Sequence, residues 1–402
     1  MIRKVSAFPP DVVSVARRLS LPSPFALQGG GELFGAEVAV ETYGRLAPAR
    51  DNAVLLFTGL SASAHAASHP ADPSPGWWEQ MIGPGRALDT ERYCILSVNS
   101  LGSCFGSTGP GSVNPATGQP YDGTFPELRV EDIARGSQAA ADALGIDRLH
   151  AVVGTSLGGM TALAHAAIFP GRARFVTSVS GALGASAAAV ATRSLQREIV
   201  GAALREAPGA PGVGQAMRWA RKIGVLSYVG SSLLEQRFGR DQTEPFAGRP
   251  SGTAFEVENW LEHLAQKFER QFNPWAYWYI SRAMDLFDFG DHGVLSDGDP
   301  ANRRRSAASL ARAAALLKVE KALVIGVHED ILFPLVQQRA IADLLKFAGV
   351  DTELVEMHSP YGHDAFLTET ALFTPVLANF LAQGRGSATS RPSRRAPDSL
   401  SR

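Results

Sequence analysis

The sequence predicts an α/β fold with a mostly parallel, doubly wound sheet and an inserted helical lid. Short apolar runs, typical of buried parallel strands, alternate with helical patterns in both the first and the last part of the chain. Between these parts, residues 184–317 show helical spacing without intervening strands. The chain has 402 residues, 45% of them hydrophobic, which is enough for one large core with an insertion.

These patterns divide the chain into a core, a lid and two terminal segments. We expect the core to comprise residues 25–183 and 318–383, and the lid to comprise residues 184–317. Residues 1–24 form a leader of uncertain order. Residues 384–402 are rich in Ser, Arg, Pro and Gly, so we expect a disordered tail there.

The composition excludes several classes of protein. The chain has 38 Lys and Arg against 39 Asp and Glu, a net charge of −1, so we expect neither a nucleic-acid nor a membrane partner. Its two cysteines, Cys94 and Cys104, form no disulfide framework and lack zinc-ligand spacing. No apolar run approaches the roughly 20 residues of a membrane span, and we find no signal peptide. We therefore expect a cytoplasmic protein.

The segment Gly154-Thr155-Ser156-Leu157-Gly158 carries the strongest chemical signal. It matches G-x-S-x-G and joins a valine-rich run to an alanine-rich helical pattern. In this setting the motif is typical of a nucleophile elbow, where two glycines leave room for a sharp turn. We therefore predict that Ser156 is the nucleophile. The Leu157 amide, at the start of the helix, is a predicted oxyanion donor. A glycine-rich turn without chemistry is the alternative.

Two further residues complete a triad with Ser156. Asp330 and His363 follow it in the chain order nucleophile, acid, histidine, which is the order of the α/β-hydrolase fold. Each of the three follows a predicted strand, so all can meet at one edge of a parallel sheet. His363 takes the serine proton and Asp330 fixes its tautomer. Glu329, next in the chain to Asp330, is the competing acid, and the choice of Asp330 rests on the family resemblance given below.

The loop after the strand at 53–58 supplies the second predicted oxyanion donor, the amide of Leu60, although an ordinary turn is the alternative. Residues 37–43 alternate like an edge strand, and residues 100–121 form a long loop. Further strands are expected at 93–99, 174–180, 322–327 and 352–357. Helices are expected at 130–144, 186–207, 215–223, 253–272, 274–287, 337–347 and 367–381, and a surface connection at 296–309.

Several longer motifs resemble those of the homoserine and serine O-acyltransferases. They are Ser97–Cys104 (SVNSLGSC), Gly106–Pro110 (GSTGP), Asn114–Gly118 (NPATG), Gly158–Met160 (GGM), Ala220–Gly224 (ARKIG), Asp330–Pro334 (DILFP) and Gly362–Asp364 (GHD). The resemblance runs from about residue 22 to residue 381. It is much more specific than G-x-S-x-G alone, and it implies an acyl-CoA-dependent enzyme.

Within this family the chain most resembles the branch that acylates serine with succinyl-CoA. Homoserine enzymes usually carry Gly-Gly-Leu-Thr-Gly where this chain has Thr58-Gly59-Leu60-Ser61-Ala62. The resemblance therefore implies that Gly59, Leu60, Ser61 and Ala62 form a substrate-specificity loop, and that Arg193 receives the acyl group. The chain departs from the family at Leu157, usually a methionine, and in a longer connection at 297–314.

The resemblance also implies the remaining roles. Arg221 and Asp364 would hold the carboxylate and ammonium of the acceptor, which suits a planar guanidinium and a carboxylate. Without substrate, a lid salt bridge for Arg221 and a helix cap for Asp364 are the alternatives. The implied reaction is a ping-pong transfer from succinyl-CoA to L-serine, giving O-succinyl-L-serine for cysteine synthesis. The implied enzyme is a homodimer through its lid helices, with no metal or prosthetic group and with succinyl-CoA or acetyl-CoA as co-substrate.

Three other functions are compatible with these residues. A homoserine O-acetyl- or O-succinyltransferase of methionine synthesis differs by one methylene in the acceptor, and a methylene is worth only about 1–3 kcal/mol in a pocket. An ester hydrolase would use the same elbow and differ in the access of water to the acyl-enzyme. A non-catalytic binding protein can share the fold, although the intact triad argues against it.

Overall fold

The computed structural model describes residues 14–206, 211–244, 254–293 and 307–383. Most of the predicted leader and all of the predicted tail lie outside these ranges. Within them, a central eight-stranded sheet has the spatial order β1-β4-β8-β5-β9-β10-β13-β14. The strands are β1 (Ser14–Ser20), β4 (Glu37–Tyr43), β8 (Cys94–Val98), β5 (Ala53–Phe57), β9 (Leu149–Thr155), β10 (Ala173–Val179), β13 (Lys321–Val327) and β14 (Asp351–Met357).

The sheet is parallel from β8 to β14, because β8, β5, β9, β10, β13 and β14 all pair in the same direction. Strands β1 and β4 are antiparallel to their neighbours. The strands at the centre, β5, β8 and β9, are buried along their whole length, which explains their continuous apolar sequences. The α/β-hydrolase fold predicted from the motif order is therefore confirmed.

The prediction that residues 37–43 form an edge strand is wrong. Strand β1, which comes from the predicted leader, pairs with β4 along all seven residues, from Ser14 opposite Tyr43 to Ser20 opposite Glu37. Strand β4 thus lies between β1 and β8. Exposure alternates only at its start, and the residues from Val40 to Tyr43 are all buried, as expected for a strand with a neighbour on each side. The β1 sequence contains Arg17 and Arg18, which weaken its strand signal.

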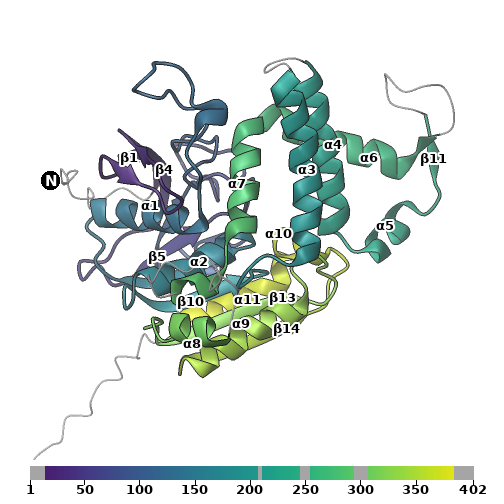
Figure 1. The fold of residues 1–402 in the computed structure, drawn as a ribbon. Coiled ribbons are helices and arrows are strands. Elements are labelled where there is room, and N and C mark those ends of the chain that lie inside the picture. Colours follow the sequence, from purple (N-terminus) through teal and green to yellow (C-terminus); the bar gives the residue numbers. More distant parts are fainter. Residues whose placement is uncertain (1–13, 207–210, 245–253, 294–306, 384–402) are drawn as a thin grey trace, which may run out of the picture.

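Helices cover both faces of the sheet (Figure 1). One hydrophobic cluster packs α1, α2 and α9 against the sheet, and a second cluster packs α11 and the segment around Trp78 against it. The helices that accompany the sheet are α1 (Val130–Ala143), α2 (Leu157–Ile168), α8 (Ala307–Ala314), α9 (Leu335–Phe347), α10 (Ala365–Thr368) and α11 (Thr370–Ala382). The predicted surface connection at 296–309 is wrong at its end, because residues 307–309 begin α8.

The lid helices follow β10 and precede β13 in the chain, and they stand above one end of the sheet (Figure 1). They are α3 (Ala187–Glu206), α4 (Pro211–Tyr228), α5 (Ser231–Phe238), α6 (Glu256–Gln271) and α7 (Pro274–Leu286), with a small ladder of β11 (Gln242–Thr243) and β12 (Ala254–Phe255). Helix α4 is longer than predicted. Its first turn contains Gly212 and Gly214, which hide the helical pattern, whereas Pro211 suits a first helical position.

The remaining short elements lie in the connections of the core. They are β2 (Phe25–Ala26), β3 (Glu32–Leu33), β6 (Ile82–Gly83), β7 (Leu88–Asp89) and the 3-10 turns η1 (Asp122–Thr124), η2 (Phe289–Gly293) and η4 (Gly362–Asp364). The closing helix predicted at 367–381 is broken at Glu369 into α10 and α11.

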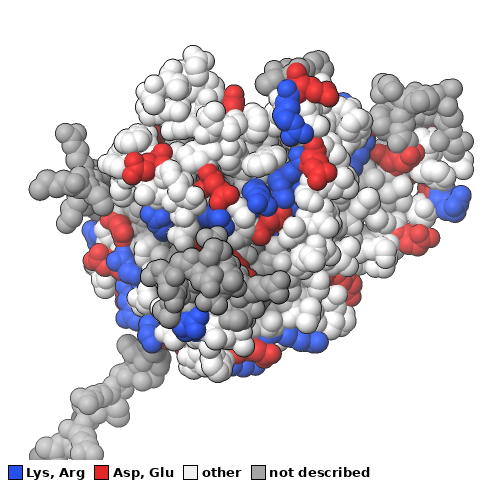
Figure 2. Space-filling view, in the orientation of Figure 1, with Lys and Arg blue, Asp and Glu red and all other residues white. Residues whose placement is uncertain are grey.

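No single helix in the described part of the chain is long and apolar enough to cross a membrane. The segment of η4 and α10 together with α11 has the length and composition of a membrane span, but it is bent by 74°. Lys and Arg side chains lie among Asp and Glu side chains on the face seen in Figure 2, in keeping with the near-zero net charge.

Candidate active site

Ser156 lies in a strained turn between β9 and α2. Its backbone has φ +56° and ψ −119°, a conformation that side-chain-bearing residues rarely adopt. The flanking glycines allow this turn. A Cβ at Gly154 would lie 1.9 Å from the carbonyl oxygen of Gly158, and a Cβ at Gly158 would lie 2.2 Å from that of Phe57. The Ser156 amide donates to the Val179 carbonyl (2.9 Å), which fixes the elbow to the next strand.

The structure brings Ser156, Asp330 and His363 together. His363 Nε2 lies 2.8 Å from Ser156 Oγ, and His363 Nδ1 lies 2.8 Å from Asp330 Oδ2. Because a carboxylate only accepts, the ring proton belongs on Nδ1, which leaves the Nε2 lone pair facing the serine hydroxyl. The other Asp330 oxygen accepts from the amides of Leu332 (2.9 Å) and Phe333 (2.8 Å). The carboxylate is thus held in the orientation that a general-base pair requires.

The competing acid, Glu329, lies elsewhere. Its carboxylate accepts from the Ser359 amide (2.8 Å) and lies 3.1 Å from His358 Nδ1. Glu329 and Asp330 are adjacent in sequence, but their side chains point in different directions after β13, so only Asp330 reaches His363.

Charge and burial act on His363 in opposite directions. Burial of the ring disfavours the imidazolium, whereas the Asp330 carboxylate stabilises it, and the balance raises the pKa of His363 above its ordinary value of 6.5. The ring also stacks on Phe333, with centroids 5.1 Å apart. The imidazole is therefore oriented by packing as well as by its hydrogen bonds.

The two predicted oxyanion donors lie at the same end of the sheet. The loop after β5 and the elbow are in backbone contact, since Gly158 packs directly on the Phe57 carbonyl. Among the described residues, neither the Leu60 amide nor the Leu157 amide has a hydrogen-bond acceptor. Two unused amides next to a nucleophile are the arrangement that an oxyanion needs.

Ser156 and His363 open into a cavity of about 190 Å³. All four residues of the predicted specificity loop line it, together with Trp77 from the segment that follows. The lid supplies much of the remaining wall, including Thr192, Arg193, Gln196, Arg221, Ser227, Tyr228 and Met284. The sequence motifs indicate both arginines of this wall, whereas Trp77, Gln196, Tyr228 and Met284 carry no signal of their own.

Arg221 and Asp364 both line this cavity. The Arg221 guanidinium lies over the rings of Tyr228 (5.2 Å) and Phe268 (5.0 Å), and its buried Nε has no hydrogen-bond partner among the described residues. Burial raises the pKa of Asp364, against the opposing effects of His363 and Arg221. Asp364 makes no side-chain cap to α10, and Arg221 makes no salt bridge with a described residue. Neither a lid salt bridge of Arg221 nor a side-chain cap by Asp364 is therefore present among the described residues.

Arg193 is buried beside the same cavity. Its Nε donates to Asp285 Oδ1 (2.6 Å), while Arg197 Nη2 lies 2.6 Å from the other oxygen of that carboxylate. Arg193 Nη1 and Nη2 are buried and have no hydrogen-bond partner in the described part of the chain. Asp285 thus holds the Arg193 side chain and leaves two guanidinium nitrogens without acceptors. Burying unpaired donors lowers the stability of the fold, and an anion bound at these nitrogens would remove that cost.

His150 and His165 are buried in the core and contact protein acceptors, and the two cysteines carry no role in the site. His150 Nε2 lies 2.8 Å from the Leu381 carbonyl, and His165 Nε2 lies 2.7 Å from Gln138 Oε1. Cys94 is buried, Cys104 is partly buried, and both are free thiols.

Comparisons with known proteins agree with this geometry. Residues 52–370 match the family model described as alpha/beta hydrolase fold. The chain is 50% identical to a serine O-succinyltransferase of Litchfieldella anticariensis over 91% of this chain and 98% of that protein. The chain belongs to the homoserine/serine O-acyltransferase family of alpha/beta hydrolases. It is accordingly an acyltransferase-family enzyme.

Other relatives vary in acyl group, acceptor and reaction. An L-serine/homoserine O-acetyltransferase of Streptomyces lavendulae is 47% identical over 91% of this chain and 97% of that protein. The crystal structure of homoserine O-acetyltransferase from Bacillus anthracis has a TM-score of 0.81 at 25% identity and covers 92% of this chain and 98% of its own. The crystal structure of esterase E22 has a TM-score of 0.78 at 25% identity, with coverages of 92% and 100%.

Proposed function

We propose that this enzyme transfers a succinyl group from succinyl-CoA to the hydroxyl of L-serine, giving O-succinyl-L-serine for cysteine synthesis in the cytoplasm. The observation that carries the choice of acyl group is Arg193, a buried guanidinium with two unused donors beside the nucleophile. A succinyl group ends in a free carboxylate, which accepts from such a fork, whereas an acetyl group offers no second anion.

In the first half-reaction, Ser156 Oγ attacks the thioester carbonyl while its proton passes to His363 Nε2. The amides of Leu60 and Leu157 hold the resulting oxyanion. The tetrahedral intermediate collapses by breaking the C–S bond, and the His363 proton goes to the leaving thiolate. The products are free CoA and a succinyl ester on Ser156.

In the second half-reaction, the hydroxyl of L-serine gives its proton to His363 Nε2 and attacks the succinyl ester. The intermediate again places its oxyanion on the two amides. Collapse breaks the bond to Ser156 Oγ, which recovers the proton from His363. In this scheme Arg221 binds the carboxylate of the acceptor and Asp364 its ammonium. The scheme uses no prosthetic group and no metal at the reacting atoms.

Transfer to L-homoserine is the second candidate, supported by the dual name of the Streptomyces lavendulae relative. The acceptor would fit the same charged pair with one extra methylene. Residues Gly59 to Ala62 line the cavity and are therefore the proposed determinant of acceptor length. Ester hydrolysis is a third candidate, because esterase E22 shares the fold.

The test is release of CoA thiol by the purified full-length enzyme, with succinyl-CoA or acetyl-CoA, in the presence of L-serine, L-homoserine or neither. The proposal expects the highest kcat/KM with succinyl-CoA and L-serine. It also expects that Arg193→Ala loses most activity with succinyl-CoA and little with acetyl-CoA, because only the succinyl group has a free carboxylate that Arg193 can bind.

Preference for L-homoserine would move the enzyme to methionine synthesis and overturn the role proposed for the loop. Equal losses with both donors in Arg193→Ala would overturn the role of Arg193. Sustained CoA release without any acceptor would identify a hydrolase.

A further inference from the structure

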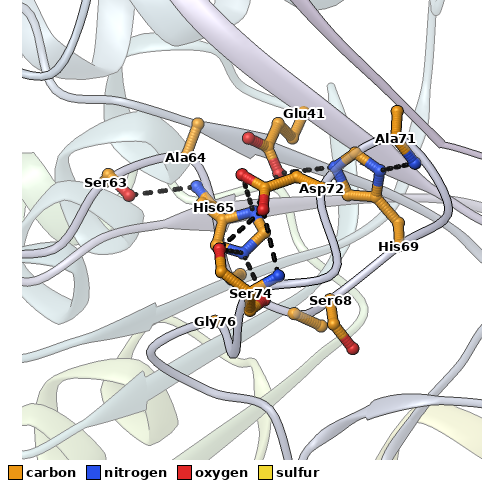
Figure 3. Close-up of polar contacts among 12 residues, drawn as sticks. Glu41, Ser63, Ala64, His65, Ser68, His69, Ala71, Asp72, Ser74 and Gly76 are labelled. Atoms are coloured by element: carbon orange, nitrogen blue, oxygen red, sulfur yellow. Dashed lines mark hydrogen bonds and ion pairs between the residues drawn. The ribbon is translucent and has the colours of Figure 1, made fainter.

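A second cluster of titratable side chains lies outside the cavity that contains Ser156. Glu41 projects from strand β4, and His65 and His69 come from the segment that follows β5 (Figure 3). None of the three lines the active-site cavity. The mechanism above gives them no task.

The ligand atoms of this cluster converge. Glu41 Oε2 lies 3.0 Å from His65 Nδ1 and 3.3 Å from His69 Nε2, and all three atoms lie within 4.8 Å of one another. Two ligands of a tetrahedral zinc ion are roughly 3.3 Å apart, given zinc–nitrogen and zinc–oxygen distances of about 2.0–2.2 Å. The spacing is therefore that of ligands around one small cation.

His69 supplies an independent indication. Its side chain is only 2% exposed, and its buried Nε2 makes no hydrogen bond within the described part of the chain. Glu41 Oε2 is near enough to accept, but the direction of the ring nitrogen misses it. A buried ring nitrogen that has no hydrogen bond and lies within 4.8 Å of the other two ligand atoms is suited to a cation between them.

The surrounding contacts orient the other two ligands. His65 Nε2 lies 2.8 Å from the Ser74 carbonyl, which requires a proton on Nε2, and Nδ1 lies at hydrogen-bond distance, 3.0 Å, from Glu41 Oε2. A metal ion would take the place of the proton between Nδ1 and Glu41. The Tyr43 hydroxyl donates to Glu41 Oε2 (2.6 Å) and accepts from the amides of Ala66 and Ala67. Ring N–H groups held by backbone carbonyls and hydrogen-bonded carboxylates are the usual surroundings of metal ligands.

We propose that Glu41, His65 and His69 bind a divalent transition-metal ion of the zinc class, with the Asp72 carboxylate as the fourth ligand. Asp72 Oδ2 lies 3.8 Å from His65 Nδ1, and the Asp72 side chain is 48% exposed, so it can move inward. His69 and Asp72 exchange both backbone hydrogen bonds at 2.9 Å, which places their side chains on one tight turn. Two carboxylates balance the charge of the ion.

Coordination changes one contact of His69. In the structure, His69 Nδ1 accepts from the Ala71 amide at a long 3.3 Å (Figure 3). Metal binding through Nε2 would place the ring proton on Nδ1, and this contact would be lost. In return the ion links residues 65–72 to strand β4. These residues lie in the chain between the specificity loop and Trp77, both of which line the cavity. The proposed site thus stabilises one wall of the active site.

The test is zinc binding by the full-length protein after dialysis against a chelator, measured by competition with a chromophoric zinc indicator and by elemental analysis. The proposal expects one tightly bound zinc per chain, lost in His69→Ala and in Glu41→Gln. Circular dichroism establishes that each variant folds. Should one variant fail to fold, His65→Gln and Asp72→Asn test the same cluster.

His358→Ala is the matched control, because the stacked pair His328 and His358, with Glu329 and Glu356 nearby, is another place where histidines meet carboxylates. This variant should retain the zinc. X-ray absorption of the zinc-loaded protein should show nitrogen and oxygen ligands at about 2.0–2.2 Å and no sulfur at about 2.3 Å. Absence of stoichiometric zinc, sulfur ligation, or loss of zinc in His358→Ala instead of His69→Ala would overturn the site.

Discussion

At the scale of single residues, the proposed catalysis depends on how Asp330 orients His363. Two backbone amides fix one oxygen of the carboxylate, and the other oxygen holds the ring proton on Nδ1. The free Nε2 then faces Ser156. Without the carboxylate the ring can carry its proton on Nε2, where it cannot accept from the serine.

This arrangement predicts the pH dependence of the reaction. His363 must be neutral to take a proton, and its pKa is raised above 6.5, so kcat/KM should fall as the pH drops through a value above 6.5 and level off at higher pH. Asp330→Asn should lower kcat by a factor of about 10⁴, because the tautomer is lost. The measurement is the pH profile of kcat/KM for both proteins.

Glu329→Gln is the matched control, because Glu329 is the neighbouring carboxylate but contacts His358 and Ser359. Its profile should resemble that of the parent enzyme. A profile that shifts in Glu329→Gln and not in Asp330→Asn would contradict the assignment of the acid.

Much of this site could be predicted from the sequence because its parts are local motifs. The glycines around Ser156 indicate a turn that only glycine permits, and Asp330 and His363 each follow a predicted strand. The Glu41 cluster could not be found in this way. Glu41 precedes His65 by 24 residues in no recognised ligand spacing, and only the pairing of β4 with β8 brings the strand beside the loop after β5.

At the scale of elements, the buried strands and the helices between them could be predicted because each has a single dominant period. The other elements have weak or mixed signals. Strand β1 has a largely polar sequence and is paired only on one side. Helix α5 has eight residues and one buried side chain, Leu233. The break at Glu369 leaves no mark in the periodicity because α10 and α11 are both apolar.

The lid helices present an apolar surface, from which we propose that the enzyme is a homodimer. Trp219 and Leu226 lie two turns apart on α4 and are 53% and 50% exposed, and Leu195 on the adjacent α3 is 50% exposed. Exposed large apolar side chains on neighbouring helices favour burial against a second copy. Sedimentation velocity should give a dimer for the parent enzyme and a monomer for Trp219→Glu.

Val336→Glu provides the control for this prediction. Val336 is 68% exposed on α9, a helix that packs against β13 and β14 and carries none of the proposed interface residues, so its substitution adds the same charge outside the proposed interface. A dimer that dissociates in Val336→Glu, or a parent enzyme that is monomeric, would contradict the proposal.

At the scale of the whole molecule, the sheet and the lid supply different parts of the proposed site. Loops at one edge of the sheet supply the residues proposed as nucleophile, base and acid and the two proposed oxyanion amides. The lid supplies Arg193 and Arg221, the cationic side chains proposed to select the donor and the acceptor. The core therefore determines the chemistry, which is why the family could be predicted from motifs. The motifs indicate Arg193 and Arg221, but the other lid residues of the cavity, such as Gln196 and Met284, are brought there by the packing of helices far apart in sequence and carry no motif.

In the proposed reaction the acyl group rests on Ser156 between the two half-reactions. Intact-protein and peptide mass spectrometry, after mixing the enzyme with succinyl-CoA in the absence of acceptor, tests this step. We expect one succinyl group per chain, located on the peptide that contains Ser156, absent in Ser156→Ala and removed on addition of L-serine. Rapid turnover without any adduct, or an adduct on another residue that is consumed by L-serine, would contradict it.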